Sequence, residues 1–406
     1  MKRIEYIVSR ENYVRSPRAD FTCPGVNDGA LIQQALDELK VNSGGSGGIL
    51  TILPGVYDCP NDIVIPEMND LTIRGEEGTI LSFSDKKRMK RTGTTSLGGL
   101  VIEGLTLKGT ADRNFSTVVP QNELLRLETV DGFRLSNLNI SGSWMSGLGL
   151  VWPGQGEVIS CHTNSNKQNG IVIWTDGTNP HNAIGVTFLG CVADYNGFDG
   201  INITCPNTVM VGCRATRSGK DTTNDAVNGF HIAGGEQPGI IFDGCVAEDN
   251  TLNGFETDRG AGSPSKPIIF KGCRASRNGG GLTYSDYAGF MLNVSRSILI
   301  GCVAEGGPDQ DFGICLRAQN IPTGNDCKYC QVVGCIVEGH NQAGQYGIVE
   351  YWASTAVSVP NDHIISNVTL LDNTTQIVAG SQYLDATRVV KTKVGNTTIV
   401  GNKIEG

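Results

Sequence analysis

Four titratable or charged residues in the middle of the chain could take part in acid–base chemistry. His231 lies in FHIAG, and Glu256, Asp258 and Arg259 lie in GFETDRG. Glu256 and Asp258 are two residues apart, so on a strand both side chains would project from one face, about 7 Å apart. Two carboxylates at that separation can act as acid and base on a sugar linkage, with a water molecule between them. The sequence therefore predicts catalytic roles for these four residues.

A second chemistry uses some of the same residues with other partners. His231 would be the base, and Arg259 or Arg317 would neutralise the carboxylate of a uronate so that its C5 proton can leave. A tyrosine from the loop GGGLTYSDYAG, either Tyr284 or Tyr287, would be the acid. Such roles require only hydrogen-bond reach. Solvated side chains on an exposed sheet are the alternative, so the residues alone leave these possibilities open.

The elements that would position these residues belong to an irregular repeat. Glycine-cysteine pairs open related segments such as GCVADYNGFDGINI and GCVAEDNTLNGFET. The cysteines of the repeat are Cys161, Cys191, Cys213, Cys245, Cys273, Cys302 and Cys335. Short alternating strands at this spacing predict stacked coils, each of which buries its apolar face against its neighbours. We expect the cysteines to be reduced core residues rather than disulfides.

A second column of the repeat follows a glycine and is apolar. Its members are Ile171, Ile201, Phe230, Phe255, Phe290, Ile314 and Ile348. Because side chains alternate along a strand, the residues next to this column should face outward. His231 should then lie one strand from Glu256, about 5 Å away at the backbone. The same outward stripe contains four candidate substrate-binding residues, which are Trp174, Asn202, Asn293 and Arg317; Trp174 would stack on a sugar ring or pack partly buried.

The N-terminal region predicts a helix that covers the open end of the stack. Residues 28–40, DGALIQQALDELK, place apolar side chains on one helical face, with Asp28 as the expected N-cap. The stretch ADFTCPGVNDGALIQQALDEL…GGILTILPGVYD resembles the opening of the pectate-lyase superfamily. That resemblance implies an all-β, right-handed parallel β-helix with an N-terminal capping α-helix. Residues 1–18 would be an extension, and residues 19–406 one domain, with coils from about residue 49.

A narrower resemblance concerns activity. GCVADYNGFDGINI and VNGFHIAG are similar to coils of bacterial alginate C5-epimerases, in which one coil reads Tyr-Gly-Phe-Asp-Pro-His with catalytic Tyr, Asp and His. The corresponding coil is expected at SGLGLVW, residues 146–152, which has none of these residues. The motifs of polygalacturonases are also absent from the sequence. The superfamily includes lyases, hydrolases, epimerases and phage tailspikes, so the resemblance implies a fold rather than one activity.

Composition excludes several classes of function. The formal charge of −9 argues against a general nucleic-acid binder. An apolar run of 18 or more residues is lacking, which predicts no membrane span, and MKRIEYIVSRENYVRSP lacks the apolar core of a secretion signal. We therefore expect a cytoplasmic or virion-associated protein. The one basic cluster, KKRMKR at residues 86–91, is a solvated loop or a contact for an anionic glycan or phosphate.

Three weaker patterns concern metals, thiols and loops. Cys327 and Cys330 form a CxxC that would suit zinc or redox chemistry, but no second pair stands at metal spacing, and no metal site is predicted from it. Cys23 and Cys59 flank the N-terminal region and could pair. Two long inserts, residues 218–229 and 278–289, should wall a groove beside the outward stripe. Asp221 and Asp225 in the first insert would suit Ca²⁺, or are plain loop acids.

Together these features predict a carbohydrate-active protein. The partner would be a polysaccharide bound in a groove over residues 174–317, and the reaction would be that of a lyase, an epimerase or a glycoside hydrolase. The alternative is a non-catalytic glycan-binding protein such as a phage tailspike or fibre subunit. The chain would be a monomer or a homotrimer.

Overall fold

The structure is a computed structural model of the chain. It describes residues 4–11, 19–93, 95–111, 121–175, 185–220, 227–234, 238–257, 266–280, 287–307, 309–318, 327, 329–340, 345–352, 364–366, 368–371, 377–381, 393–394, 397–400 and 403–405. The contacts divide the chain into two compact units, unit 1 (Met1–Gly197) and unit 2 (Phe198–Gly406). Each unit is built from short parallel strands arranged in three sheets, called A, B and C below.

Unit 1 begins with a helix and the first coils. Sheet A contains, in spatial order, β2 (Phe21–Cys23), β1 (Ile4–Arg10), β3 (Ser46–Ile52), β6 (Asn69–Gly75), β10 (Val101–Glu103), β14 (Phe133–Ser136), β17 (Gly156–Ile159) and β20 (Val186–Leu189). Sheet B contains β4 (Gly55–Cys59), β7 (Thr79–Phe83), β11 (Thr106–Lys108), β15 (Asn139–Ser141), β18 (His162–Asn164) and β21 (Val192–Asp194). Sheet C contains β5 (Ile63–Val64), β8 (Met89–Arg91), β12 (Leu125–Glu128), β16 (Leu148–Val151) and β19 (Ile171–Trp174), and β9 (Leu97–Gly98) pairs separately with β13 (Val130–Asp131).

Unit 2 repeats the same arrangement. Sheet A contains β23 (Val209–Val211), β26 (Ile241–Asp243), β29 (Ile269–Lys271), β32 (Ile298–Ile300), β35 (Gln331–Val333), β38 (Ile364–Ser366), β42 (Thr397–Val400) and β41 (Lys393–Val394). Sheet B contains β24 (Arg214–Thr216), β27 (Val246–Glu248), β30 (Arg274–Ser276), β33 (Val303–Glu305), β36 (Ile336–Glu338), β39 (Thr369–Leu371) and β43 (Lys403–Glu405). Sheet C contains β22 (Ile201–Ile203), β25 (Phe230–Ile232), β28 (Phe255–Thr257), β31 (Ala288–Leu292), β34 (Phe312–Ala318), β37 (Tyr346–Trp352) and β40 (Ile377–Ser381).

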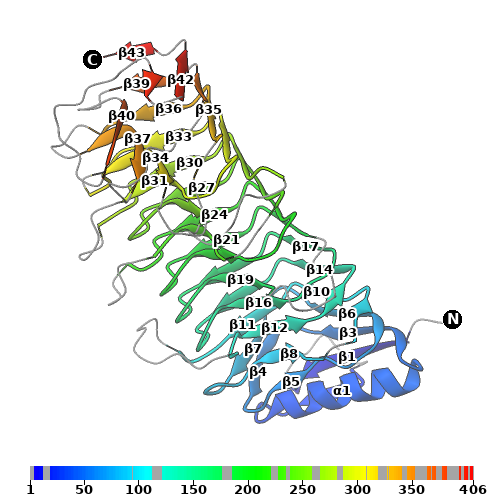
Figure 1. Ribbon diagram of the computed structural model, residues 1–406. Coiled ribbons are helices and arrows are strands. Elements are labelled where there is room, and N and C mark those ends of the chain that lie inside the picture. Colours follow the sequence, from blue (N-terminus) through cyan, green and yellow to red (C-terminus); the bar gives the residue numbers. More distant parts are fainter. Residues whose placement is uncertain are drawn as a thin grey trace. The chain divides into compact units, whose positions relative to one another are not determined.

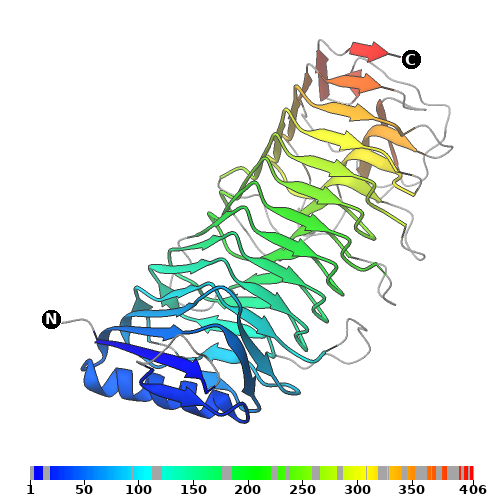
Figure 2. The same cartoon turned by 180° about the vertical axis from the view of Figure 1, so that it is seen from behind.

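From β3 to β40, apart from the pair β9 and β13, successive strands enter sheets A, B and C in turn, so each coil supplies one strand to each sheet. Equivalent strands of successive coils therefore lie side by side within a unit (Figure 1), and the view from behind shows the same parallel rows (Figure 2). This is the parallel β-helix that the sequence predicts. The repeat produces it because residues facing inward from each short strand have an apolar partner directly above and below.

Aromatic and sulfur ladders fill the core of unit 2. Phe230, Phe255 and Phe290 are register partners, and successive rings stack at 4.8 and 4.9 Å with interplanar angles of 3°. Phe242 and Phe270 form a second stack at 4.9 Å. The predicted apolar column is thus confirmed in this unit.

The cysteines behave as core residues throughout the chain. All thirteen are buried free thiols, including Cys23 and Cys59. Four thiols of the repeat reach a backbone carbonyl of the preceding coil; for example, Cys245 Sγ lies 3.4 Å from Met210 O, and Cys302 Sγ lies 3.3 Å from Phe270 O. Burial raises the pKa of Cys23 to about 12 and that of Cys205 to about 11, so these thiols stay protonated. The predicted reduced packing of the cysteine column is confirmed.

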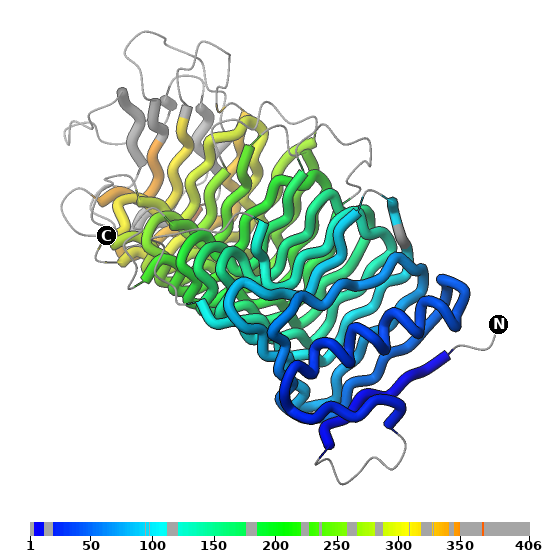
Figure 3. The backbone as a smooth tube through the Cα atoms, turned by 90° about the horizontal axis from the view of Figure 1, so that it is seen from below, coloured from blue at the N-terminus to red at the C-terminus, as the bar shows by residue number. Residues whose placement is uncertain are grey.

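Helix α1 (Asp28–Asn42) forms where a helix is predicted and ends two residues later. It lies against β1, β3 and β4, beside the first coils of unit 1 (Figure 3). Its N-cap is Asn27, which has left-handed backbone angles and makes no capping side-chain bond, so the prediction of Asp28 as the N-cap is wrong. The buried Asp28 carboxylate instead accepts from Arg10 Nη1 at 2.5 Å and from the backbone amides of Gly25 and Asp58.

The parallel sheet of unit 1 also begins earlier than predicted. Strand β1 lies in the part of the chain expected to be an extension, and Tyr6 of β1 is the register partner of Leu50 in β3. An aspartate at the start of α1 is therefore used to tie this extra strand to the helix through Arg10.

Candidate functional site

The site is built on one position of the repeat, the residue that precedes the glycine at the start of each sheet C strand. In three successive coils of unit 2 this residue is Asp199, Asn228 or Asn253. Each side-chain Oδ1 accepts the backbone N–H of the equivalent residue in the next coil: Asn228 N to Asp199 at 2.9 Å, Asn253 N to Asn228 at 3.2 Å, and Ala288 N to Asn253 at 2.8 Å. The ladder leaves the second side-chain atom of each residue available for other partners.

Glycine is required after this position because the coils approach closely there. A Cβ on Gly200 would lie 2.7 Å from the carbonyl oxygen of Gly229, and one on Gly229 would lie 2.7 Å from that of Gly254. No side chain fits into such gaps without a shift of the backbone. The glycines thus hold the ladder side chains at a fixed distance from sheet C.

At Asp199 the second carboxylate oxygen binds an imidazole. Asp199 Oδ2 lies 2.9 Å from His231 Nδ1 and accepts a hydrogen bond of 2.9 Å from Asn202 Nδ2. The aspartate side chain is 1% exposed, whereas that of His231 is 18% exposed. When the buried carboxylate holds the proton on Nδ1, the lone pair of a neutral imidazole is on Nε2. In that tautomer His231 can accept a proton at Nε2; the Asn202 amide nitrogen also lies 3.2 Å from Nδ1.

Two coils from Asp199 the same local geometry carries the opposite chemistry. Asn253 donates from Nδ2 to Glu256 Oε2 at 3.2 Å, and Asn293 donates from Nδ2 to Glu256 Oε1 at 3.4 Å. Both amides favour the ionised carboxylate because they donate to it. Asn293 is nearly buried and also donates to Thr257 O at 2.6 Å, so the structure places it beside the acid as a support.

His231 and Glu256 are neighbours on sheet C, as predicted. They are register partners in β25 and β28, and adjacent parallel strands lie about 4.8 Å apart. An imidazole and a carboxylate therefore project from the same face of two adjoining strands. A sugar residue placed over that face would be within reach of both groups.

Other predicted site residues have different surroundings. Tyr287 precedes β31, is 5% exposed, and donates its backbone N–H to Asp311 Oδ2 at 3.1 Å. Arg317 lies on β34 and is half-buried. Asp258, Arg259, Tyr284, Asp221 and Asp225 lie outside the described residues, so their roles remain predictions.

Farther along sheet C the outward positions become apolar. Met291 in β31 and Cys315 in β34 occupy the column of His231 and Glu256, and each is 1% exposed. They belong to a buried cluster with Ala288, Phe312, Tyr346 and Val349. The polar part of the outward stripe in unit 2 therefore ends after Glu256 in this column.

Trp174 lies in unit 1, at the end of β19. Its side chain is 41% exposed, and its ring lies 5.5 Å from the Trp152 ring at an angle of 41°. The exposed indole of Trp174 offers a flat apolar face of the kind on which sugar rings stack. The predicted exposure of Trp174 is confirmed.

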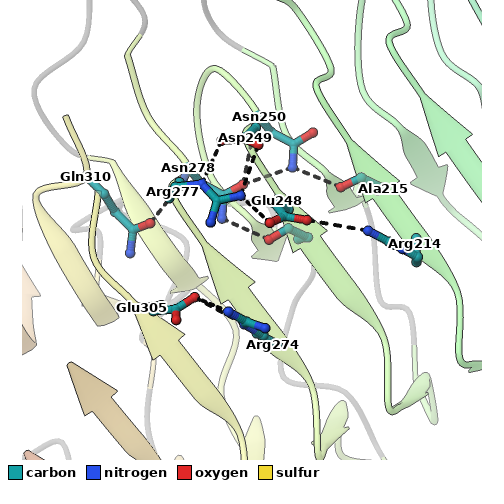
Figure 4. A network of polar contacts seen from close by, with 11 residues as sticks. Arg214, Ala215, Glu248, Asp249, Asn250, Arg274, Arg277, Asn278, Glu305 and Gln310 are labelled. Carbon is teal, nitrogen blue, oxygen red and sulfur yellow. Dashed lines mark hydrogen bonds and ion pairs between the residues drawn. The ribbon is translucent and has the colours of Figure 1, made fainter. Parts of the chain in front are cut away.

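Sheet B of unit 2 carries charged residues of a different kind (Figure 4). Arg274 binds Glu305 at 2.5 Å, and Arg277 binds Asp249 at 3.1 Å and also Glu248. The turn beside them is held by buried amides, with Asn250 Nδ2 donating to Asn278 Oδ1 at 2.9 Å. These acids are paired with arginines on an exposed face, which is the arrangement of a surface ion-pair network rather than of a proton-transfer site.

The described residues contain neither a cluster of metal ligands nor a membrane-spanning helix. Within the described ranges, no group of three or more potential ligands lies close enough to hold a metal ion. Cys327 and Cys330 are in contact through their sulfur atoms at 3.3 Å, both buried and free. No helix in the described part of the chain is long and apolar enough to cross a membrane.

Asp199 is the residue that sequence reasoning missed. The repeat itself contains the signal for this residue. The position before the glycine holds an asparagine in three coils (Asn169, Asn228 and Asn253) and an aspartate in a fourth (Asp199). Comparing the coils only from the glycine onward leaves this position out. A carboxylate that replaces an amide in a buried ladder indicates a partner that donates a proton, and here that partner is His231.

Comparison with known proteins supports the fold. Residues 146–303 match the family model described as a right-handed β-helix region. No curated protein matches the sequence significantly. The chain is thus a right-handed parallel β-helix.

Solved structures of the same fold come from several functional classes. The catalytic domain of a GH87 α-1,3-glucanase in complex with tetrasaccharides is similar with a TM-score of 0.62 and 13% identity, over 91% of this chain and 67% of that one. The catalytic unit of a thermostable GH87 α-1,3-glucanase from Streptomyces thermodiastaticus has a TM-score of 0.60 and 13% identity, over 93% of this chain and 65% of that one. An N-terminal fragment of bacteriophage Phi29 gene product 12 has a TM-score of 0.59 and 13% identity, over 91% of this chain and 63% of that one. The chain therefore spans about two thirds of the length of these proteins.

Proposed function

We propose that the protein is an enzyme that acts on a polysaccharide, and that proton transfer through His231 is its central chemistry. The observation that carries the proposal is the hydrogen bond of 2.9 Å between His231 Nδ1 and the buried carboxylate of Asp199. A surface histidine needs no buried acid for stability, whereas a general base needs one to fix its tautomer and to stabilise the imidazolium that forms.

Further residues around the sugar would complete a reaction on a uronate. In a uronate, abstraction of the C5 proton by His231 Nε2 leaves charge that spreads onto the sugar carboxylate. Arg317 and Arg259 are the candidate cations for that carboxylate, and Tyr284 or Tyr287 is the candidate proton donor on the other side. Release of the leaving group at C4 gives a lyase, and return of a proton to the opposite face gives an epimerase.

The fold likeness supports a glycan as the substrate class. Similar solved structures include glucanases complexed with oligosaccharides, and the tilted Trp152–Trp174 pair provides a stacking surface in unit 1. Asn202 would then act as a positioning residue, because its amide binds Asp199. The polar groove would lie over β22, β25 and β28 of unit 2, where Asn202, His231 and Glu256 project from neighbouring strands.

Hydrolysis is the second candidate, because amides donate to both oxygens of Glu256, an arrangement that suits a carboxylate acting as a base on water. A panel of acidic and neutral polysaccharides separates the candidates. Ultraviolet absorbance of unsaturated uronates, lost in His231→Ala, would support a lyase. Reducing ends without that absorbance, lost in Glu256→Gln, would support a hydrolase. Binding of a glycan with no chemical change on any substrate would overturn the enzyme proposal in favour of a binding protein.

A further inference from the structure

One aromatic ring in unit 1 is flanked by two lysines. Trp144 lies in the turn after β15, and the ammonium groups of Lys167 and Lys86 lie 4.8 and 5.6 Å from the centre of its ring. Both distances are within the range of a cation–π interaction. Lys86 begins the basic run KKRMKR and is exposed, Trp144 is half-buried and Lys167 is buried, so the group reaches solvent on the side of Lys86.

The turns that carry these residues are tied together by hydrogen bonds. Lys167 N donates to Ser143 O at 3.0 Å, Ser143 Oγ donates to Asn122 O at 3.1 Å, and Asn122 Nδ2 donates to Lys86 O at 2.8 Å. The turns lie between sheet B and sheet C strands of successive coils. These hydrogen bonds therefore fix the turns that carry Lys86, Trp144 and Lys167 relative to one another.

Neither ammonium group has a counter-ion in the part of the chain that the structure describes. Within the described residues, the side chains of Lys86 and Lys167 form no ion pair, whereas Lys90 binds Asp62 at 2.6 Å and Lys271 binds Asp243 at 3.0 Å. Lys167 is nevertheless only 4% exposed. Burial of the Lys167 ammonium group without an ion pair is unfavourable, and a bound anion would compensate for it.

The fold does not require a lysine at position 167. The residue follows the buried ladder asparagine of its turn, and in equivalent turns that place is taken by Thr251 after Asn250 and by Gly279 after Asn278. A small residue is thus sufficient for the turn. The Trp144 indole Nε1 is also buried without a hydrogen-bond partner among the described residues, so this corner is not optimised for stability.

We propose that Lys86, Trp144 and Lys167 form an anion-binding subsite that holds a carboxylate or sulfate group of an acidic polysaccharide. The two ammonium groups supply charge-assisted hydrogen bonds, and the indole ring holds them through cation–π contacts. The inference rests on the proposed function in that the ligand is a glycan. It extends that function because it assigns the charged group of the glycan a binding place in unit 1.

Titration calorimetry on the full chain tests the subsite with three probes: polygalacturonate for carboxylate, dextran sulfate for sulfate ester, and dextran as the neutral control. We expect one or both acidic polymers to bind, dextran to bind less, and the double variant Lys86→Met/Lys167→Met to lose about tenfold in affinity. Methionine keeps most of the apolar stem of the buried lysine, and the thermal midpoint checks that the variant is folded. Lys271→Met, which removes an exposed lysine that has a counter-ion, is the matched control and should not change affinity.

Equal affinity of wild type and double variant would overturn the subsite, as would stronger binding of dextran than of both acidic polymers. The single variant Lys167→Arg retains the charge and should keep most of the affinity, which guards against a folding defect. Failure of the proposed chemistry is separable, because His231→Ala should bind the acidic polymer like wild type. Binding that depends on the lysines without any turnover would leave the subsite standing and remove the enzyme proposal.

Discussion

Two coils of unit 2, those whose ladder residues are Asp199 and Asn253, are called the first and the second rung below. The two rungs share one geometry and differ in which side chain carries the negative charge. In the first, the ladder residue is the acid, and Asp199 accepts from Asn202 and binds His231. In the second, the ladder residue is the amide, and Asn253 donates outward to Glu256. In both, a ladder side chain contacts the residue three positions later, on the outward face of sheet C. The ladder residue therefore decides which group faces outward. A buried acid holds the His231 imidazole in the first rung, and buried amides hold the Glu256 carboxylate in the second.

Removal of the imidazole should have the largest effect. His231→Ala eliminates the proposed base, and we expect turnover of an acidic polysaccharide to fall by about 10²–10⁴-fold. Glycan binding should stay within a few-fold of wild type, because His231 is proposed to act on the reacting proton. Initial rates and calorimetry on the same preparation measure the two effects. A variant that retains full turnover would exclude His231 as the base.

Conversion of the first rung into the second should be nearly as damaging. Asp199→Asn retains an oxygen for Asn228 N but places an amide donor beside His231 Nδ1. The imidazole would then carry its proton on Nε2 and lose its function as a base, with a loss of about 10²–10³-fold in turnover. The pH–rate profile should also change shape. Asp249→Asn, at an exposed acid paired with Arg277, is the matched control and should behave like wild type.

The second rung is tested by neutralising its acid. Glu256→Gln removes the charge and keeps the size, and we expect about 10–10²-fold lower turnover if Glu256 transfers a proton or orients water. Glu305→Gln, an exposed acid bound to Arg274, serves as the control. An unchanged rate in Glu256→Gln would assign the acid a structural role and leave the first rung as the whole site.

Conversion of the second rung into the first should affect stability most. Asn253→Asp places a buried carboxylate beside Glu256 and removes the donor to its Oε2, at a cost of about 1–3 kcal/mol in the free energy of unfolding. Because the like charges raise the folded-state pKa of one carboxyl, the deficit should be full at neutral pH and shrink as the pH falls below that pKa. Urea titrations at several pH values measure it. In the double variant Asn253→Asp/Glu256→Gln the repulsion is gone, so most of the loss should be recovered.

The scaffold could be predicted from the sequence because its signals are local and repeated. The Gly-Cys pairs and the column from Phe230 to Phe290 define inward positions, and a period of two then places His231 beside Glu256. These inferences need only strand alternation and stacking. The helix at residues 28–42 follows from its apolar face in the same way.

The parts that could not be predicted depend on side chains that reach beyond their own rung. Asp199 precedes the strand and contacts His231 of the next coil, so no pattern within one strand reveals the pair. Met291 has an outward position but is buried in an apolar cluster that the alternation rule does not describe. Asn27 replaces Asp28 as the N-cap because the aspartate is used by Arg10, which lies 18 residues earlier in the chain.

Solvent deuterium exchange at C5 of a polyuronate tests the central claim most directly, because lyases and epimerases both begin by removing that proton. The protein would be incubated with polygalacturonate or alginate in D₂O, and label in the product would be followed by NMR. The account predicts incorporation at C5, or unsaturated ends in its place, by the wild type and loss of both in His231→Ala and Asp199→Asn. Equal rates in wild type and His231→Ala, or no exchange and no unsaturated product with any polyuronate, would contradict it.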